Sequence, residues 1–224
     1  MRILAISPHP DDVEYGLAGI LLRLRACQHK ITVLYNTKYD LYEDAQSISH
    51  DARSFDIKNA CTMMNAEYGF FSIDDTLSHL ASCMVEEEPD IIFLPALHDH
   101  NLIHQRVHIR IKETIETARK QNSGNGRFHL HQVFYYETFS STNFEPNFIA
   151  DVTKEYALAK RILQAHQIGI QILPSLLYRH QLMHQLRGFE CSCLYGEGLQ
   201  IEQEIPYLWK DNRKVGLQML SEII

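Results

Sequence analysis

Hydrophobic and polar residues follow one another in blocks along this chain, and the blocks predict strands that alternate with helices. Short, mainly apolar runs are typical of parallel strands that are covered on both faces. Five runs are predicted as strands, at residues 3–7, 31–35, 68–73, 91–94 and 133–136. The segments between them predict helices at residues 15–27, 50–65, 76–86 and 104–120. This alternation predicts an α/β fold with a Rossmann-like, doubly wound and mainly parallel sheet flanked by helices.

The last third of the chain has a different pattern. From Thr153 onward the sequence predicts a mostly helical C-terminal portion, which Pro174 and Gly188 interrupt. A Gly/Asn-rich break at residues 122–126 marks a surface turn. The chain has 224 residues, of which 45% are hydrophobic, and no repeat or linker divides it. We therefore expect residues 1–224 to form a single domain with one core.

Composition excludes some classes of function. The formal net charge of −7 argues against nucleic-acid binding, because neutralising phosphates requires a basic surface. No apolar stretch approaches the roughly 20 residues that cross a bilayer, and no signal peptide is recognisable, so we expect a cytoplasmic protein without membrane insertion. Five cysteines are present. We expect reduced thiols, although the C-x-C pair Cys191 and Cys193 could form half of a metal site.

Candidate chemistry begins where the first predicted strand ends. The sequence ILAISPHPDD at residues 3–12 places His9, Asp11 and Asp12 directly after that strand. Ligands bind at such strand ends in open α/β sheets, and a histidine with two carboxylates suits a divalent metal. One acid could then be a ligand and the other a general base. The alternative is that Asp11 or Asp12 caps the following helix.

A second cluster follows the fourth predicted strand, at residues 95–108 with the sequence PALHDHNLIHQRVH. The carboxyl ends of both strands should lie at one edge of the sheet, so the two clusters could complete a site of two imidazoles, one carboxylate and an open position. That ligand set is typical of catalytic zinc. We expect His108, inside the helix, to be solvated, and the i, i+4 pair His180 and His184 to lie on a solvated or interface face.

These residues carry a resemblance to a known family. The element S-PHPDD-x-E-x-G at residues 7–16, followed by Ala18-Gly19 and a second cluster ending in a histidine, resembles the PIG-L/LmbE-like zinc-dependent N-deacetylases. The resemblance extends to Arg53, Asp56 and Ala60 and to segments 133–142 and 146–153. It implies a hydrolase that uses one Zn²⁺ per chain to remove an acetyl group from an N-acetylated amino sugar or its conjugate.

The resemblance also implies roles for single residues. His9 and Asp12 match the first two zinc ligands, and Asp11 matches the general base. His104 matches the third ligand, with His100 as the alternative in another register. Ile103 stands where the family usually has Asp, so a carboxylate that would support a neighbouring histidine is missing. The alternative function is therefore a sugar-binding or catalytically impaired member that keeps the fold and the metal.

The substrate site is less well defined by the sequence. His98, or else His100, could supply a proton or an oxyanion contact, and we assign this catalytic role to His98. Arg53 and Asn101 are candidates for substrate binding, although Arg53 could equally lie exposed on a helix face. The substrate is expected to be a small-molecule N-acetyl amino-sugar conjugate, and homo-oligomer formation is left open. Five aromatic residues could line the sugar site: Tyr39, Tyr42, Tyr135, Tyr136 and Phe139. The first strand-to-helix turn has no G-x-G-x-x-G, which argues against a dinucleotide-binding oxidoreductase.

Overall fold

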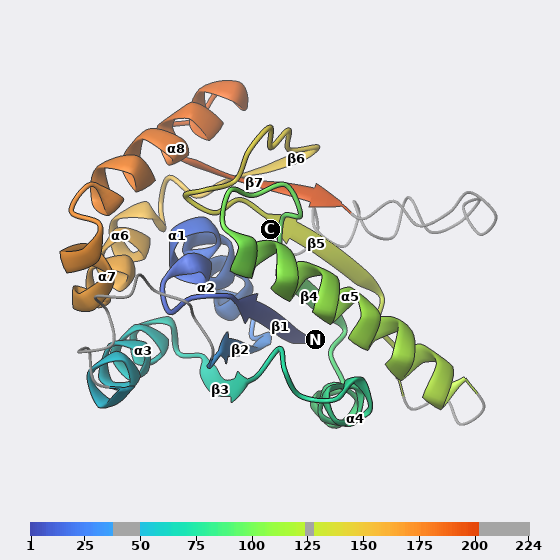
Figure 1. Cartoon of the computed structure of the whole chain (residues 1–224). Helices are drawn as coiled ribbons and strands as arrows, with labels where there is room; N and C mark the ends of the chain where they lie inside the picture. Colours follow the sequence, from blue (N-terminus) through green and yellow to red (C-terminus); the bar gives the residue numbers. More distant parts are fainter. Residues whose placement is uncertain (38–49, 124–127, 202–224) are drawn as a thin grey trace.

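The computed structural model describes residues 1–37, 50–123 and 128–201, and Figure 1 shows their arrangement. These residues form a seven-stranded sheet with the order β3-β2-β1-β4-β5-β7-β6. The strands are β1 (Arg2–Ser7), β2 (Lys30–Asn36), β3 (Glu67–Phe71), β4 (Ile91–Pro95), β5 (Gln132–Tyr136), β6 (Phe148–Asp151) and β7 (Gly196–Ile201). Strands β1 to β5 pair in parallel, and β7 pairs antiparallel with both β5 and β6. The mainly parallel, doubly wound sheet predicted from the sequence is confirmed.

Helices cover both faces of this sheet. They are α1 (Asp12–Gly16), α2 (Ala18–Ala26), α3 (His50–Met64), α4 (Leu77–Glu87), α5 (Leu102–Asn122), α6 (Tyr156–Gln164), α7 (Gln167–Ile172) and α8 (Leu176–Glu190). Strand β1 shows the two-sided burial that this layering requires. Ile3 and Ala5 pack in one apolar cluster with residues of α2, α3 and α6, whereas Leu4 and Ile6 pack in a second cluster with residues of α4 and α5. The uninterrupted apolar character of the strand follows from this burial.

The strand order reverses between β1 and β4, and this reversal positions the site. Strand β1 lies between β2 and β4, and the chain leaves β1 toward α1 and α2 but leaves β4 toward α5 on the other face (Figure 1). In open α/β sheets such a reversal opens a crevice beyond the carboxyl ends of the two strands. The two histidine clusters of the sequence follow these two strand ends.

The C-terminal portion contains helices α6, α7 and α8 as expected, but it also contributes strand β7, which the sequence did not predict. The sequence of β7 is GEGLQI, and its two glycines weaken any local preference for a strand. Pairing with β5 and β6 therefore decides its conformation. The buried Glu197 of β7 accepts hydrogen bonds from the backbone N–H groups of Gly19 (2.8 Å) and Ile20 (2.7 Å), which fixes this portion on the start of α2.

The first predicted helix also differs from the expectation. The helix predicted over residues 15–27 is divided at Leu17 into α1 and α2, and α1 begins earlier, at Asp12.

Among the residues that the structure describes, none of the helices combines the length and the apolar character needed to cross a bilayer.

Candidate metal centre

The turn after β1 folds Asp12 back onto His9. The backbone N–H of His9 donates to Oδ2 of Asp12 at 2.8 Å, and the Ser7 hydroxyl donates to the carbonyl oxygen of His9 at 2.6 Å. Asp11 occupies the N-cap position of α1, yet its side chain makes no capping hydrogen bond. Oδ1 of Asp12 is buried and has no hydrogen-bond partner among the described residues. Neither carboxylate therefore serves as the helix cap that was the alternative interpretation.

The turn after β4 brings His104 to the same place. Asn101 is the N-cap of α5, and its Oδ1 accepts a hydrogen bond from the backbone N–H of Ile103 at 2.9 Å. Asp99 accepts a hydrogen bond from the backbone N–H of Asn101 at 2.7 Å. These contacts fix the first turn of the helix, which carries His104 into the crevice.

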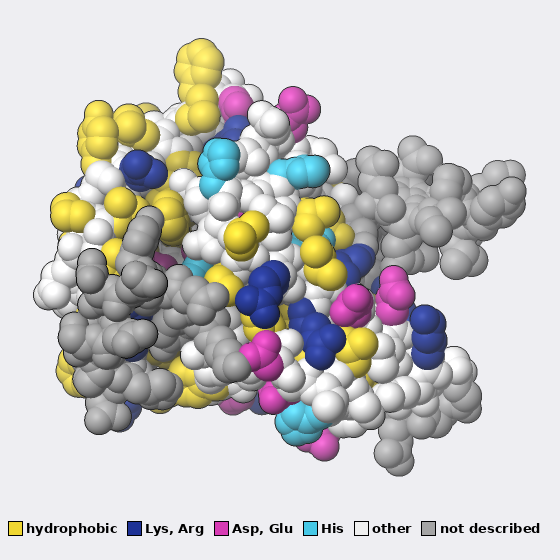
Figure 2. Space-filling view, in the orientation of Figure 1, with side chains coloured by type: hydrophobic (Ala, Val, Ile, Leu, Met, Phe, Trp, Pro, Cys, Tyr) yellow, Lys and Arg dark blue, Asp and Glu magenta, His cyan; other side chains and the backbone are white. Residues whose placement is uncertain are grey.

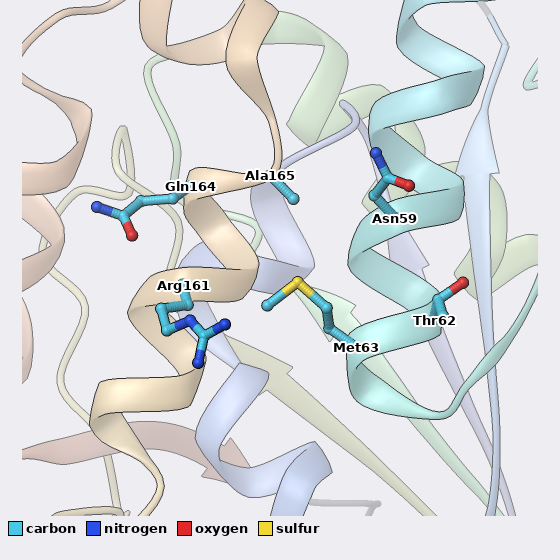
Figure 3. A pocket seen from close by; sticks show the side chains of 6 residues that line it. All are labelled: Asn59, Thr62, Met63, Arg161, Gln164 and Ala165. Atoms are coloured by element: carbon cyan, nitrogen blue, oxygen red, sulfur yellow. The ribbon is translucent and has the colours of Figure 1, made fainter.

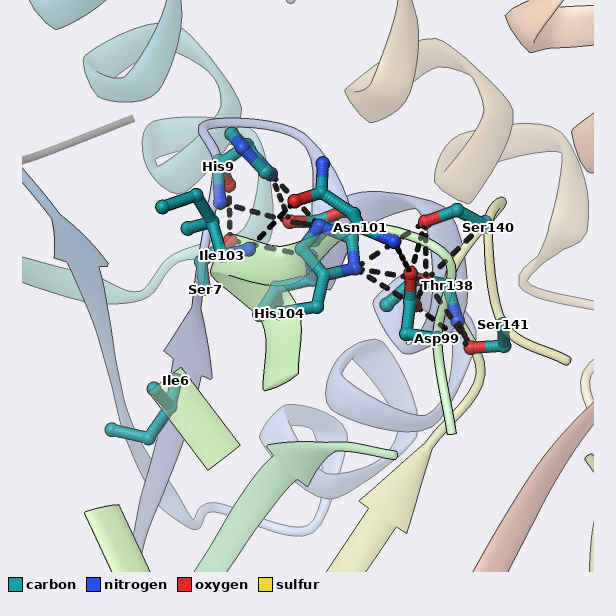
Figure 4. Close-up of polar contacts among 12 residues, drawn as sticks. Ile6, Ser7, His9, Asp99, Asn101, Ile103, His104, Thr138, Ser140 and Ser141 are labelled. Carbon is teal, nitrogen blue, oxygen red and sulfur yellow. Dashed lines mark hydrogen bonds and ion pairs between the residues drawn. The ribbon is translucent and has the colours of Figure 1, made fainter. Parts of the chain in front are cut away.

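Three ligand atoms from the two turns converge, as Figure 4 shows for the two histidines. Nδ1 of His9 lies 2.8 Å from Nε2 of His104, and Oδ2 of Asp12 lies 3.1 Å from each of these nitrogens. Ligands bound tetrahedrally to zinc at about 2.1 Å would lie about 3.4 Å apart, so a small expansion would admit the ion. All three side chains are buried, and in the described ranges they form the one group of this kind. Two imidazoles and one carboxylate fit a catalytic zinc ion.

Asp99 orients His104 from the opposite side of the imidazole ring. Its Oδ2 lies 2.8 Å from Nδ1 of His104, and Figure 4 shows the hydroxyl groups that surround it. Thr138 donates to Oδ2 at 2.6 Å and Ser140 donates to Oδ1 at 2.6 Å. A carboxylate behind a ligand histidine fixes the ring and its tautomer. Sequence reasoning gave Asp99 no such role, although its position five residues before His104 was a usable signal.

Ile103 stands where the family usually has an acid. This difference does not leave His104 without support. The Ile103 side chain is buried in the apolar cluster formed with α4 and α5. The carboxylate of Asp99 makes the contact with His104 instead.

The charges of the cluster shift the pKa values of its members in opposite directions. Burial alone would lower the pKa of His104, but the carboxylates of Asp12 and Asp99 raise it to about 10. Burial alone would raise the pKa of Asp12, but His104 and His9 hold it well below its usual value. Without a metal, the cluster therefore holds a proton on His104 that a bound cation would have to displace.

Asp11 lies in a different environment from Asp12, against the C-terminal portion of the chain. A methyl group at Gly169 of α7 would overlap Oδ2 of Asp11, so α7 packs directly on this carboxylate. Burial, followed by the negative charge of Asp12, raises the pKa of Asp11 to about 6. A carboxyl group with this pKa can take up and release a proton near neutral pH.

His166 is a buried histidine near Asp11 that sequence reasoning missed. It precedes α7, and its Nε2 lies 3.4 Å from Oε1 of Glu14. Burial lowers the pKa of His166, but the charges of Glu14, Asp11 and Asp56 together raise it. Asp56 of α3 also accepts a hydrogen bond from the backbone N–H of Ile168 at 3.1 Å, which ties α3 to α7. His166 belongs to no motif, so only the fold reveals its position.

The remaining predicted residues have varied surroundings. Arg53 lies on α3 and is buried, not exposed on a helix face. Asn101 caps α5, as described above. His98 and His100 are exposed in the loop after β4, and the structure brings His104, not His100, to the cluster. The catalytic role of His98 and the substrate contacts of Arg53 and Asn101 stay predictions.

Three histidines that were expected at solvated or interface positions are buried. Nδ1 of His108 lies 2.8 Å from the carbonyl oxygen of Pro95, because α5 packs on the end of β4. His180 and His184 pack against Tyr156, with ring centroids at 5.4 Å and 5.3 Å. The expectation of solvent exposure was wrong because polar faces of α5 and α8 turn toward buried partners.

The aromatic residues that were predicted to line the sugar site lie in different surroundings. Tyr136 is buried and donates to the carbonyl oxygen of Ile6 at 2.7 Å, so it supports the sheet and does not line a binding site. Phe139 approaches His104 edge-on, with a centroid distance of 6.3 Å. Tyr135 packs against His108 at 5.0 Å. Tyr39 and Tyr42 lie outside the described residues.

A surface groove of about 450 Å³ lies between α3 and α6. Figure 3 shows its lining, which consists of Asn59, Thr62, Met63, Arg161, Gln164 and Ala165. None of these residues belongs to the His/Asp cluster, so the groove is separate from the candidate metal centre.

Comparison with known proteins gives a family match and a set of similar structures. The family model described as "PIG-L: GlcNAc-PI de-N-acetylase" matches residues 4–118, which include both turns of the cluster. The conserved protein TT1542 from Thermus thermophilus is 19% identical and has a TM-score of 0.77, with 93% of this chain and 98% of that chain covered.

Two further structures carry named activities. GalB, the 4-carboxy-2-hydroxymuconate hydratase from Pseudomonas putida, is 18% identical with a TM-score of 0.77, and 92% of this chain and 99% of that chain are covered. N,N'-diacetylchitobiose deacetylase from Pyrococcus horikoshii is 16% identical with a TM-score of 0.71, and the coverage is 92% and 87%. These similarities establish a shared fold, and a fold that includes both a hydratase and a deacetylase does not by itself decide the reaction.

Proposed function

Because this chain belongs to the PIG-L family, we propose that it is a zinc-dependent hydrolase that removes an acetyl group from an N-acetylated amino sugar or its conjugate. The observation that carries the proposal is the convergence of His9, Asp12 and His104 beside a further carboxyl group, that of Asp11. The three converging residues would hold the metal. When bound, zinc supplies a water molecule of lowered pKa and polarises a carbonyl oxygen.

We assign Asp11 as the general base. Its carboxylate would accept a proton from the attacking water and then deliver that proton to the departing amine. In the metal-free protein, burial raises the pKa of Asp11 to about 6, toward the neutral pH at which both steps would take place. The two adjacent acids would therefore have different roles, metal binding for Asp12 and proton transfer for Asp11. Asp12 faces His9 and His104, whereas Asp11 faces α7.

The surroundings of His104 favour catalysis over the alternative of an impaired, sugar-binding member. The doubt about turnover came from Ile103, but Asp99 contacts Nδ1 of His104 at 2.8 Å and is itself held by three hydroxyl groups. A ligand histidine supported in this way keeps a fixed ring orientation and is a stronger metal ligand.

The substrate contacts are proposed on chemical grounds. Arg53 offers a planar guanidinium suited to bidentate contacts with an anionic or hydroxyl-rich group. Asn101 and His98 belong to the loop and helix start that also carry Asp99, so both are candidates for contacts with the reacting amide. Phe139, edge-on to His104, offers an apolar surface on which a sugar ring could pack.

The experiment that tests this function combines metal analysis with acetate release from a panel of N-acetylglucosamine derivatives. We expect about one zinc per chain and zinc-dependent acetate release. Asp11→Asn should keep the zinc but lower kcat by about 10² to 10⁴-fold, the usual contribution of general acid–base catalysis. The matched control is Asp74→Asn, an exposed acid before α4, which should leave kcat unchanged. Stoichiometric zinc with no acetate from any derivative would contradict the proposal and favour the sugar-binding alternative.

A further inference from the structure

Two cysteine thiols lie close together where α8 ends and the chain turns toward β7. Sγ of Cys191 is 3.2 Å from Sγ of Cys193, and Cys191 is the C-cap residue of α8. The Cys191 side chain is exposed and that of Cys193 is half-buried. The other cysteines, Cys27, Cys61 and Cys83, lie on or next to other helices, α2, α3 and α4.

The backbone of this turn sets the two thiols beside each other. In an extended chain, residues i and i+2 are about 6.6 Å apart, near the upper limit for the Cα atoms of a disulfide. Here Ser192 has φ of 63°, a left-handed conformation that curls the chain. The backbone N–H of Cys193 donates to the carbonyl oxygen of Gly188 at 2.8 Å, which closes the turn against the helix. A side chain at Gly188 would collide with the backbone of Leu194, so the close approach depends on glycine.

We propose that Cys191 and Cys193 form a reversible dithiol–disulfide pair that low-molecular-weight disulfides of the glutathione type oxidise. The Cys191 thiolate attacks one sulfur of the oxidised glutathione, and the first glutathione thiolate leaves. The Cys193 thiolate then attacks the sulfur of Cys191, and the second glutathione leaves. Two protein thiols lose two protons and two electrons, and one glutathione disulfide is reduced to two glutathione molecules. The sulfurs need to approach only from 3.2 Å to about 2.05 Å.

The surroundings of the two sulfurs determine the order of attack. Cys191 is exposed and accessible to a small disulfide. The Cys193 thiol donates to the carbonyl oxygen of Tyr195 at 3.2 Å, and burial together with the neighbouring Cys191 raises its pKa to about 12. Cys193 is therefore the slower nucleophile while Cys191 is free. Once Cys191 carries glutathione it no longer bears a negative charge, which removes one of the causes that hold Cys193 protonated.

The location of the pair makes the bond accessible and easy to reduce. Hydrophobic side chains are exposed along α8, as Figure 2 shows at the upper left. Phe189 and Leu194, which precede and follow the two cysteines in the sequence, are both exposed. The bond would join residues two apart in an exposed turn, and exposed or strained disulfides are the ones that cellular thiols reduce readily. The oxidised and reduced forms should therefore interconvert in glutathione buffers.

The test equilibrates the whole protein in buffers of graded oxidised-to-reduced glutathione ratio, quenches in acid, alkylates free thiols and maps the peptides by mass spectrometry. We expect the peptide containing both cysteines to lose two alkylatable thiols in one step, to weigh two hydrogens less and to carry no glutathione. Addition of dithiothreitol should restore both thiols. Cys83→Ser, an exposed cysteine on α4, is the matched control and should behave as the unmodified chain does.

The single variants identify the mechanism. Cys193→Ser should trap glutathione on Cys191, whereas Cys191→Ser should leave Cys193 largely unreacted. Glutathione remaining on Cys191 of the unmodified chain, or both thiols still alkylating in the most oxidising buffer, where oxidised glutathione is in large excess, would overturn the proposal. Protection from alkylation that EDTA removes would identify a thiolate metal site and would also overturn it. None of these readings depends on catalytic activity, so they are independent of the deacetylase proposal.

Discussion

His9 and His104 form one buried pair of histidines, and His180 and His184 on α8 form another. The ring centroids are 4.8 Å apart in the first pair and 4.0 Å in the second. Each pair also contacts a buried carboxylate, from Asp12 in the first case and from Glu197 in the second. Burial, proximity and a neighbouring acid are therefore common to both pairs.

The two pairs differ in what their nitrogens face. In the first pair, one nitrogen of each ring and an oxygen of Asp12 converge on a common point. In the second pair, both nitrogens of His184 are used, by the carbonyl oxygen of His180 (2.8 Å) and by Glu197 (3.1 Å). Both nitrogens of His180 have no hydrogen-bond partner among the described residues, and its ring stacks on Tyr156. A metal site thus requires nitrogen and oxygen lone pairs that are directed at a common point. The burial of two neighbouring histidines does not by itself provide this arrangement.

The largest expected effect separates the two pairs by metal content. Asp12→Ala should abolish stoichiometric zinc and reduce acetate release below detection, because it removes one of the three proposed ligands. His180→Phe should keep zinc and activity, because a phenyl ring retains the stacking on Tyr156 and His180 is no ligand. Zinc per chain after dialysis, measured by atomic emission, checks both variants, with circular dichroism as the test of folding. Loss of zinc from His180→Phe with retention in Asp12→Ala would reverse the comparison.

The C-terminal portion and the candidate metal centre meet at Gly169. Gly169→Ala should push the Asp11 carboxylate away from its position, since a methyl group there overlaps Oδ2. A displacement of about 1 Å at a reacting group can cost about 10²-fold, so kcat should fall by roughly that factor while zinc content stays constant. The matched substitution Gly69→Ala on β3 meets only the flexible end of Leu34 and should leave kcat unchanged. An unchanged kcat in Gly169→Ala would argue against Asp11 as the general base.

A smaller effect is expected from the contact behind His104. Asp99→Asn should weaken zinc binding by about 10 to 100-fold, because residues that orient ligand histidines usually contribute that much. Ser140→Ala removes only one hydroxyl contact to Asp99 and should weaken binding less. Competition with a chromophoric chelator measures both affinities. Equal affinities in Asp99→Asn and the unmodified chain would show that His104 needs no carboxylate behind it.

The sequence was most informative where local pattern and burial agree. The apolar runs of β1, β2 and β4 indicated strands buried on both faces, and the two histidine clusters followed from the ends of β1 and β4. Strand β7 could not be predicted in the same way, because GEGLQI becomes a strand only by pairing with β5 and β6. His166 and Gly169 reach Asp11 only through the packing of α7, which no spacing in the sequence encodes.

The histidines of α5 and α8 show a second limit of sequence reasoning. His108 and His180 occupy helical positions that looked polar, and both are buried. A histidine can be buried against a carbonyl oxygen or an aromatic ring, and the sequence does not distinguish this from exposure to solvent. Asp99 was visible in the sequence, but its contact with His104 depends on how the loop folds at the start of α5.

The two pairs also respond to acid in opposite ways, and the smallest expected effect follows from this difference. Burial, together with the charges of His184 and Lys160, lowers the pKa of His180 from 6.5 to about 2, whereas carboxylates raise that of His104 to about 10. His180 therefore stays neutral in the folded protein below pH 6.5, while it gains a proton in the unfolded chain. Stability from this residue is fully present above pH 6.5 and is lost as the pH falls toward 2, by about 1.4 kcal/mol per pH unit.

Replacing His180 by Phe removes this titrating group, so the free energy of unfolding of His180→Phe should fall less steeply with acid than that of the unmodified chain. Urea titrations of the metal-free protein between pH 6 and 4 measure this slope. His129→Phe, at an exposed position, should keep the original slope. Equal slopes in His180→Phe and the unmodified chain would mean that the buried ring is protonated in the folded state, and the contrast between the two pairs would then rest on geometry alone.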